Sequence, residues 1–222
     1  MPKIDLHTHT WVSPDGGLLP KHFEAAFVRG LLDYVAVTDH NTIAAAQQLQ
    51  RRFGERIIVG EEISTREGDL IGLYLTQAVP AGLSAREAAH RIKAQGGLVY
   101  VPHPFERLRK SGGTTMLAAL SDAIDILETH NGRIFLRRPN GLAASYAAQH
   151  ALPAAASSDA HGFVGWGSTY TMLPQRPTRD TLCALLSGAT LSKGRPGVRM
   201  LLYPTANRLR KRLNLAATVD TL

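Results

Sequence analysis

The sequence lacks the features that would tie it to a membrane or to an oxidising compartment. It has a single cysteine, Cys183, in 222 residues, which excludes an internal disulfide and fits a reducing cytoplasm. A single thiol also excludes a cysteine-rich zinc site, so any metal ion would need nitrogen and oxygen ligands. No run of about 18 apolar residues is present, and residues 1–5 lack the apolar stretch of a signal peptide. We therefore expect a cytoplasmic protein without a transmembrane segment.

Acidic residues are also scarce at the C-terminal end, where Asp220 is the only acid in residues 193–222. The basic residues of this segment are Lys193, Arg195, Arg199, Arg208, Arg210, Lys211 and Arg212. The formal net charge of the chain is +7, and this segment carries +6 of it, so residues 1–192 are nearly neutral. The division predicts a globular domain over residues 1–192 followed by a basic C-terminal segment.

The basic segment has helical spacing in its central part, because Leu209 and Leu213 lie at i and i+4 among arginines and a lysine. Two interpretations stay open for such a short amphipathic helix. Its leucines pack against the domain, or its cations bind an anionic polymer or lipid. On the second interpretation, truncation after Tyr203 leaves hydrolysis of a small phosphoester intact but weakens RNA binding.

Short β-rich apolar runs alternate with longer helical patterns along the first 192 residues. The runs expected to be strands cover residues 4–10, 34–38, 56–60, 70–75, 98–101, 123–127, 154–156 and 169–173. The helical patterns cover residues 22–30, 42–53, 84–96, 114–121, 138–150 and 177–188, and Ser84 is an N-cap with Glu87 as its capping-box partner. This alternation predicts an α/β fold with a mainly parallel sheet.

Acidic and histidine residues gather where these strands end. They are His7, His9, Asp39, His40, Glu61, Glu62, His103, Glu128, His130, Asp159 and His161, and Asp15 follows in the loop after the first strand. Six strand ends carry such residues, and the strand ends of a closed barrel converge on one mouth. An open doubly wound sheet would supply its site from only two or three strand ends. The pattern therefore favours an irregular barrel of roughly seven strand–helix units.

The strand-end set has the composition of a site for several metal ions. His7 and His9 lie on one side of their strand, because successive side chains of a strand alternate between faces. Imidazoles and carboxylates without a thiolate suit zinc, manganese or iron. Their number exceeds what a single tetrahedral ion uses, which predicts two or three divalent ions bridged by a carboxylate. Such clusters generate hydroxide near neutral pH and stabilise the attacking and leaving oxygens in displacement at phosphorus.

The motifs that carry these residues resemble those of the PHP (polymerase and histidinol phosphatase) metal-dependent phosphoesterases, in the family's order over about residues 3–165. The matching pieces are His7-Thr8-His9, Ser13-Pro14-Asp15-Gly16, Thr38-Asp39-His40-Asn41-Thr42, Gly60-Glu61-Glu62-Ile63-Ser64, Pro102-His103-Pro104-Phe105, Glu128 with Asn131-Gly132, and Ser158-Asp159-Ala160-His161. Each piece is weak alone, and together they are specific. The resemblance implies a distorted (β/α)7 barrel of the TIM type with a trinuclear metal centre.

The resemblance also implies a set of ligands and roles. They are His7, His9, Glu62 and Asp159 for a first ion, Glu62 and His103 for a second, and Asp15, His40 and His161 for a third. Many relatives have a histidine just before the strand at residues 70–75 as a ligand of the second ion. This chain has Asp69 there, which can still bind a metal but leaves the identity and occupancy of that ion open. Glu62, Asp159 and His161 are assigned to catalysis, and the Gly-x-Glu pattern turns Glu61 away.

Other residues near these motifs keep two interpretations. Asp39 precedes His40 and therefore points to the opposite side of the strand. It either orients the metal ligands from behind or serves the fold alone. His130 is a further ligand or a structural residue. Arg107 and Arg109 bind substrate phosphate or are exposed loop charges. Trp166, in a glycine-rich loop, stacks on a base at the mouth or packs at the rim.

Three functions are consistent with these features. The first is hydrolysis of the phosphate ester of a small phosphorylated metabolite or a nucleotide, with a metal-activated hydroxide attacking phosphorus. The second is an exonuclease with the same chemistry on RNA or DNA ends, with the basic segment binding nucleic acid. The third is a metal-binding module without catalysis, against which the nearly complete ligand set argues.

Overall fold

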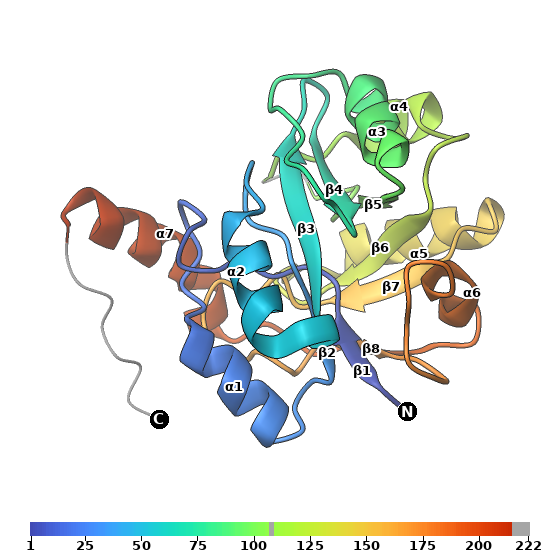
Figure 1. Ribbon diagram of the computed structural model, residues 1–222. Coiled ribbons are helices and arrows are strands. Elements are labelled where there is room, and N and C mark those ends of the chain that lie inside the picture. Colours follow the sequence, from blue (N-terminus) through green and yellow to red (C-terminus); the bar gives the residue numbers. More distant parts are fainter. Residues whose placement is uncertain (107–108, 215–222) are drawn as a thin grey trace.

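The computed structural model describes residues 1–106 and 109–214. In this part of the chain, nine strands form one sheet in the order β7-β6-β5-β4-β3-β2-β1-β8-β9 (Figure 1). The strands are β1 (Lys3–Asp5), β2 (Tyr34–Val37), β3 (Ile57–Ser64), β4 (Asp69–Leu73), β5 (Leu98–Val101), β6 (Ile126–Asn131), β7 (Ala154–Ser157), β8 (Tyr170–Met172) and β9 (Thr190–Ser192). The first eight correspond to the predicted strands, and β9 was not expected.

The sheet is mixed, which corrects the prediction of a mainly parallel sheet. The pairs β1–β2, β2–β3, β5–β6 and β6–β7 are parallel, whereas β3–β4, β4–β5, β1–β8 and β8–β9 are antiparallel. The connection from β3 to β4 explains one reversal, because it is a short turn in which the Thr65 amide donates to the Gly68 carbonyl at 3.0 Å. A turn of this length joins antiparallel neighbours, since a parallel pair needs a crossover of a dozen or more residues.

The two halves of the sheet curl towards each other and nearly close a barrel. The Ala156 amide of β7 donates to Thr171 Oγ1 of β8 at 2.9 Å, and the His9 amide donates to the Ala160 carbonyl at 2.9 Å. At the end of β1, the buried carboxylate of Asp5 accepts hydrogen bonds from the Ser158 amide and from Trp166 Nε1, both at 3.0 Å. These contacts confirm the predicted distorted barrel and place the end of β1 beside the end of β7.

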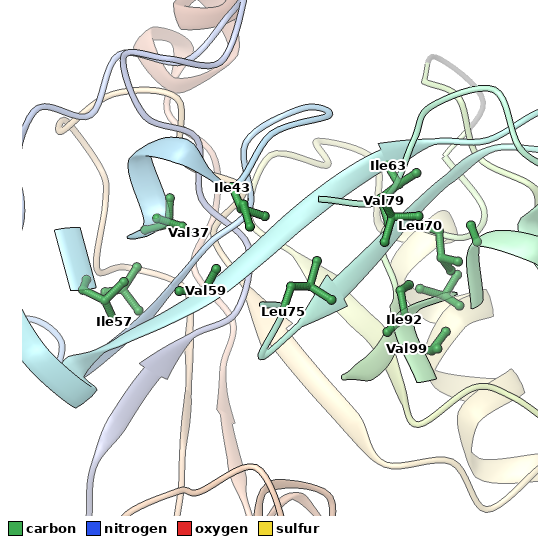
Figure 2. Packing of buried hydrophobic residues seen from close by; sticks show 14 of the residues in the cluster. Val37, Ile43, Ile57, Val59, Ile63, Leu70, Leu75, Val79, Ile92 and Val99 are labelled. Carbon is green, nitrogen blue, oxygen red and sulfur yellow. The ribbon is translucent and has the colours of Figure 1, made fainter. Parts of the chain in front are cut away.

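Alternation along β3 divides the core into two layers. Ile57, Val59 and Ile63 face outward and pack beneath the helices, as the row of apolar side chains along β3 in Figure 2 shows. Ile58 faces the barrel interior with Tyr100 and other apolar residues. Each fully buried side chain of this kind stabilises the fold by about 1.5–3 kcal/mol. The same alternation turns Glu62 to the interior side of the sheet and Glu61 to the outer side.

Helices pack on the outside of the sheet (Figure 1). They are α1 (Pro20–Val28), α2 (Ala44–Phe53), α3 (Ala85–Ala94), α4 (Gly113–Ala119), α5 (Arg137–Gln149), α6 (Leu182–Leu186) and α7 (Val198–Arg212), with a short 3-10 turn, η1 (Gly54–Arg56). Ser84 caps α3 as predicted, because its hydroxyl oxygen accepts from the Glu87 amide at 3.2 Å. The predicted helix at residues 177–188 is wrong in length, since only Leu182–Leu186 are helical. None of the described helices has the length and apolarity needed to cross a membrane.

The C-terminal helix differs from its prediction in length and in packing. It begins at Val198 and contains Pro204 within it. Its buried residues are Met200, Pro204 and Asn207, which lie on one face at i, i+4 and i+7. Leu209 and Leu213 are 57% and 58% exposed, so the interpretation in which these leucines pack against the domain is wrong. Residues 215–222 of the basic segment lie outside the described part of the chain.

Candidate metal centre

The first strand brings two histidines into the barrel mouth. His7 and His9 are fully buried beyond the end of β1, with Nε2 atoms 3.1 Å apart. Thr8 lies between them and faces the other way, where its hydroxyl donates to the Ala36 carbonyl at 2.7 Å. Strand β1 ends at Asp5, so the prediction of a strand over residues 4–10 is wrong in length, although the two imidazoles do point to the same side of the chain. Thr8 fixes that orientation by tying the chain after β1 to β2.

A first group of ligand atoms gathers around these histidines. Asp159 Oδ1 lies 3.6 Å from His7 Nε2 and 3.5 Å from His9 Nε2. One nitrogen or oxygen from each of the three residues falls within 4.8 Å of the others. Asp159 has a φ of 52°, and His103 a φ of 29°. Left-handed backbone is costly for residues other than glycine, and such strain clusters at functional sites.

A second group shares Glu62 with its neighbours. Glu62 Oε1 lies 3.2 Å from His103 Nε2, while Oε2 lies 3.5 Å from His7 Nε2 and 3.2 Å from His9 Nε2. The same oxygen lies 3.3 Å from His40 Nδ1. The two carboxylate oxygens therefore face different sets of imidazoles, an arrangement that a bridging ligand requires. Glu61 points away, as predicted, and accepts from the Val79 amide at 2.7 Å.

The third group contains His9, Asp15, His40 and His161, with one ligand atom of each within 4.8 Å of the others. Asp15 Oδ2 lies 3.7 Å from His40 Nε2 and 3.5 Å from His161 Nε2. The three groups together bring eight of the nine predicted metal ligands into one cluster, in which all but the half-buried His40 are buried. The ninth, Asp69, lines the same pocket at the start of β4.

Asp69 Oδ1 is buried and has no hydrogen-bond partner among the described residues. Burial, reinforced by the charge of Glu62, raises the pKa of Asp69 to about 6. An unsatisfied carboxylate oxygen in a buried site is unfavourable unless a cation or a donor reaches it. This oxygen, the carboxylates and the imidazoles fit a divalent metal ion with nitrogen and oxygen ligands.

Protonation in the cluster follows from the crowding of acids and bases. Burial lowers the pKa of His9, but hydrogen bonds to Asp159 and Glu62 outweigh burial and raise it to about 9. Burial raises the pKa of Glu62, but the charges of His40 and His7 hold it well below its ordinary value. Burial and the positive charge of Arg133 lower the pKa of His161 to about 3. A metal ion would displace protons from imidazoles such as His9, because a histidine binds metal only in its neutral form.

Glu128 orients the ligands from behind. Its Oε1 lies 3.1 Å from His7 Nδ1, and its Oε2 accepts from the His103 amide at 2.6 Å and from Asn131 Nδ2 at 2.9 Å. Carboxylates that hold the second nitrogen of a histidine fix its tautomer and ring orientation. His130 Nε2 instead lies 3.2 Å from the Gly194 carbonyl, outside the three groups. Of its two interpretations, the structural one therefore fits.

Asp39 likewise supports the site without facing it. Its two oxygens accept from the amide and the hydroxyl of Thr10, each at 2.6 Å. These bonds hold the chain that follows His9 against the end of β2. Trp166 is 5% exposed and donates to Asp5 at 3.0 Å. The interpretation of Trp166 as a stacking residue at the mouth is therefore wrong, because its ring belongs to the core.

Three arginines contact the carboxylates of the cluster. Arg109 Nη1 pairs with Asp159 Oδ2, and Arg133 Nη1 lies 3.2 Å from Asp159 Oδ1. Arg208 Nη2 lies 2.7 Å from Asp15 Oδ2. The sequence indicated Arg109, but Arg133 and Arg208 were missed. Arg133 had a local signal, since it comes directly after the Asn131-Gly132 motif, whereas Arg208 had none.

Arg107, the other predicted phosphate-binding residue, lies outside the described residues. The pocket above the cluster has a volume of about 1240 Å³. Such a volume exceeds the roughly 300–1,000 Å³ of ordinary small-molecule sites. Besides the cluster, residues of α5 and α7 line it, among them Leu142 and Arg208.

Helix α7 is fixed to the loops that carry two of the ligands. Asn207 Nδ2 donates to the carbonyls of Asp15 and His161, both at 2.8 Å. Lys211 Nζ donates to the Gly16 carbonyl at 2.9 Å. Gly17 permits this approach, since a Cβ there would lie 2.9 Å from Asn207 Nδ2. The helix (red in Figure 1) is therefore a wall of the site, and part of the segment after residue 192 packs on the barrel.

Comparison with known proteins places this geometry in context. A model of the PHP-associated (PHP_C) family matches residues 137–190. Two proteins of Methanocaldococcus jannaschii, both named as uncharacterized, are 34% identical to the chain. One match covers 142 residues, which are 58% of this chain and 83% of that protein. The other covers 173 residues, which are 76% of this chain and 69% of that protein.

Solved structures with the same fold include a two-domain protein of Bacteroides vulgatus, described as containing a predicted PHP-like metal-dependent phosphoesterase. It is 18% identical with a TM-score of 0.65, and the match covers 93% of this chain but only 63% of that chain. A lesion-specific endonuclease of Pyrococcus furiosus is 16% identical with a TM-score of 0.59, and the match covers 86% of this chain and 57% of that one. At these identities the likeness concerns the fold.

Proposed function

We propose that this chain, which a PHP-associated family model matches at residues 137–190, is a metal-dependent phosphoesterase of the PHP family. Its substrate is the phosphate ester of a small phosphorylated metabolite or a nucleotide. One observation carries the proposal: eight predicted ligands from distant parts of the sequence meet in three overlapping groups in one largely buried cluster. A structural role does not require so many ionisable groups to be buried together, because burying charge is costly unless a partner neutralises it.

The proposed roles follow from the contacts. Two or three divalent ions (Mn, Zn or Fe), when bound, would lower the pKa of water to near neutrality and polarise the phosphoryl oxygens. Glu62 would bridge two ions, since its oxygens face separate histidines. Asp159 and His161 would complete the ion sites beside it. Arg109 and Arg133, which reach the cluster from its rim, would neutralise the developing charge on the phosphoryl group.

A nuclease acting on RNA or DNA ends is the second candidate. The specific observation in its favour is α7, which lines the pocket through Arg208 and carries Arg210, Lys211 and Arg212 in its last turn. Cations placed there would extend phosphate contacts beyond the reacting ester. The structure of Endonuclease Q with a 27-mer duplex, 17% identical with a TM-score of 0.62, shares this fold.

A panel of phosphoesters with added manganese tests the proposal. It should contain nitrophenyl phosphate, mononucleotides, nucleotide bisphosphates and short RNA. Turnover that requires the metal and is lost in Asp159→Asn, but not in the exposed control Asp180→Asn, is expected. Metal binding without turnover of any ester would instead establish a non-catalytic metal-binding module. Cleavage confined to RNA would favour the nuclease.

A further inference from the structure

One exposed aromatic residue at the pocket is not explained by packing. Phe135 lines the pocket and is 74% exposed. The other five phenylalanines all pack against another ring, in the pairs Phe23–Trp166, Phe27–Phe53, Phe105–Tyr146 and Phe163–Trp166. A phenyl ring left in solvent gives up the stabilisation that burial would provide. Its place at the mouth therefore points to a ligand.

Phe135 is part of an apolar surface on the rim. On the same side, Leu136 and Leu142 line the pocket and are 67% and 45% exposed. Helix α7 contributes Leu201, 37% exposed, and the buried Pro204 to the lining. The pocket lining thus combines the ionisable cluster with exposed apolar side chains, beside the charged side chains of Lys110 and Arg138, a composition that suits a ligand with a charged and an apolar end.

Only a short stretch of chain separates the charged part of this pocket from its exposed phenyl ring. Arg133, which contacts Asp159 and lies 3.2 Å from His161 Nδ1, is only two residues before Phe135. Two residues of extended chain span at most about 7 Å. Because Arg133 and Phe135 both line the pocket, a ligand with its phosphate at Arg133 and the metal centre can extend its organic part towards the phenyl ring. Arg109 and Arg208 supply the charge that complements the phosphate end.

We propose that Phe135 is a platform on which an aromatic ring of the substrate stacks, so that the preferred substrates are nucleotides rather than aliphatic phosphate esters. This inference rests on the proposed phosphoesterase function and narrows its substrate class. Phe135 is a specificity-determining residue in this scheme and takes no part in the reaction at phosphorus. Stacking of a base on an aromatic side chain tolerates any base, because every base has a π-face.

Hydrolysis of adenosine 5′-monophosphate and of glycerol phosphate by manganese-loaded protein tests the platform. Phe135→Ala should raise KM for the nucleotide by about tenfold, the effect of losing one base–aromatic stack. KM for glycerol phosphate and kcat for both substrates should stay within about twofold. Phe135→Tyr should restore the nucleotide KM, and Val28→Ala, which shortens an 81% exposed side chain on α1, is the matched control.

An equal change in KM for both esters, or no change for the nucleotide, would overturn the inference. Binding separates it from the proposed function, because it needs no turnover. Titration calorimetry of the metal-loaded protein should show tighter binding of adenosine 5′-monophosphate than of inorganic phosphate, and Phe135→Ala should remove the difference. If no ester is hydrolysed but this difference is present and lost in the variant, the platform stands and the phosphoesterase assignment fails.

Discussion

Replacement of Asn207 by alanine should release α7 from the site and impair hydrolysis of even a small phosphoester. Asn207 is 3% exposed, and its amide group donates to the carbonyls of Asp15 and His161 at 2.8 Å. These carbonyls belong to residues whose side chains are candidate ligands of one ion. The alanine variant leaves both carbonyls without their donor and disconnects the two ligand loops.

The size of the effect follows from the two hydrogen bonds. Each contributes about 0.5–1.5 kcal/mol, and a buried acceptor left without a donor costs about 1–3 kcal/mol. Partial access of water to the carbonyls reduces the sum, so about 2–4 kcal/mol should be lost from the docking of α7. This corresponds to roughly 30- to 1000-fold in the equilibrium between docked and released helix. The matched control is Leu209→Ala on the same helix, where the side chain is 57% exposed and less than about 0.5 kcal/mol is expected.

Two measurements check this prediction. Amide hydrogen exchange should accelerate over residues 198–212 in Asn207→Ala and remain unchanged in Leu209→Ala. Hydrolysis of nitrophenyl phosphate should fall in the first variant only, and truncation after Tyr203 should lower it as well. Unchanged exchange and unchanged activity in Asn207→Ala would refute the role of α7 as a wall of the site. They would restore the interpretation of this segment as an accessory arm.

Three further predictions concern the cluster and its surroundings. His9→Ala should abolish hydrolysis while its circular dichroism spectrum stays near that of the wild type. The exposed control His90→Ala should keep both the spectrum and full activity. Activity retained in His9→Ala would place catalysis elsewhere. Purified protein should hold about two to three equivalents of transition metal by elemental analysis. Chelation should lower the melting temperature, because ions that bind only the folded state stabilise it. One equivalent or none after careful loading would contradict the assignment of a cluster of metal ions. Glu61→Gln should gain stability relative to the wild type between pH 5 and pH 8. Burial raises the pKa of Glu61 from 4.5 to about 7, so between these pH values the folded wild type holds a proton that the unfolded chain releases. The stability of the wild type therefore falls as the pH rises through that interval, and the glutamine variant lacks this loss. Stability curves of the two proteins that run parallel would contradict the prediction.

The sequence indicated the cluster because most of its residues lie at or just beyond the C-terminal end of a strand whose apolar pattern is local, whereas Asp15 lies in a loop and Asp69 at the start of β4. His7 and His9 share a side through simple alternation, and the same rule separates Glu61 from Glu62 on β3. Parallel strand ends then converge whatever the details of the connections. Neither the order of the strands nor a mixed sheet had to be known for the cluster to be predicted.

The parts that sequence reasoning missed depend on contacts between distant segments. Arg208 pairs with Asp15, 193 residues earlier in the chain, and no local pattern reports such a pair. The helical spacing of Leu209 and Leu213 was real, but it identified the exposed face. The buried face of α7 includes Asn207, a polar residue that hydropathy patterns count as exposed, and its burial depends on carbonyls that only the folded loops present.

Because α7 is held by polar contacts, its position should affect the positions of the candidate metal ligands. A helix that packed through leucines would be held by non-directional contacts and could shift without disturbing the ligands. Asn207 instead binds the backbone of the two ligand loops, and hydrogen bonds to buried carbonyls have a narrow range of geometry. Movement of α7 therefore changes the separation of Asp15 and His161. For this reason, substitutions at the helix should alter the affinity for metal as well as the affinity for substrate, and calorimetric titration with manganese distinguishes the two. A weaker manganese isotherm is expected in Asn207→Ala, and an isotherm identical to that of the wild type would show that the loops hold their ligand geometry without the helix.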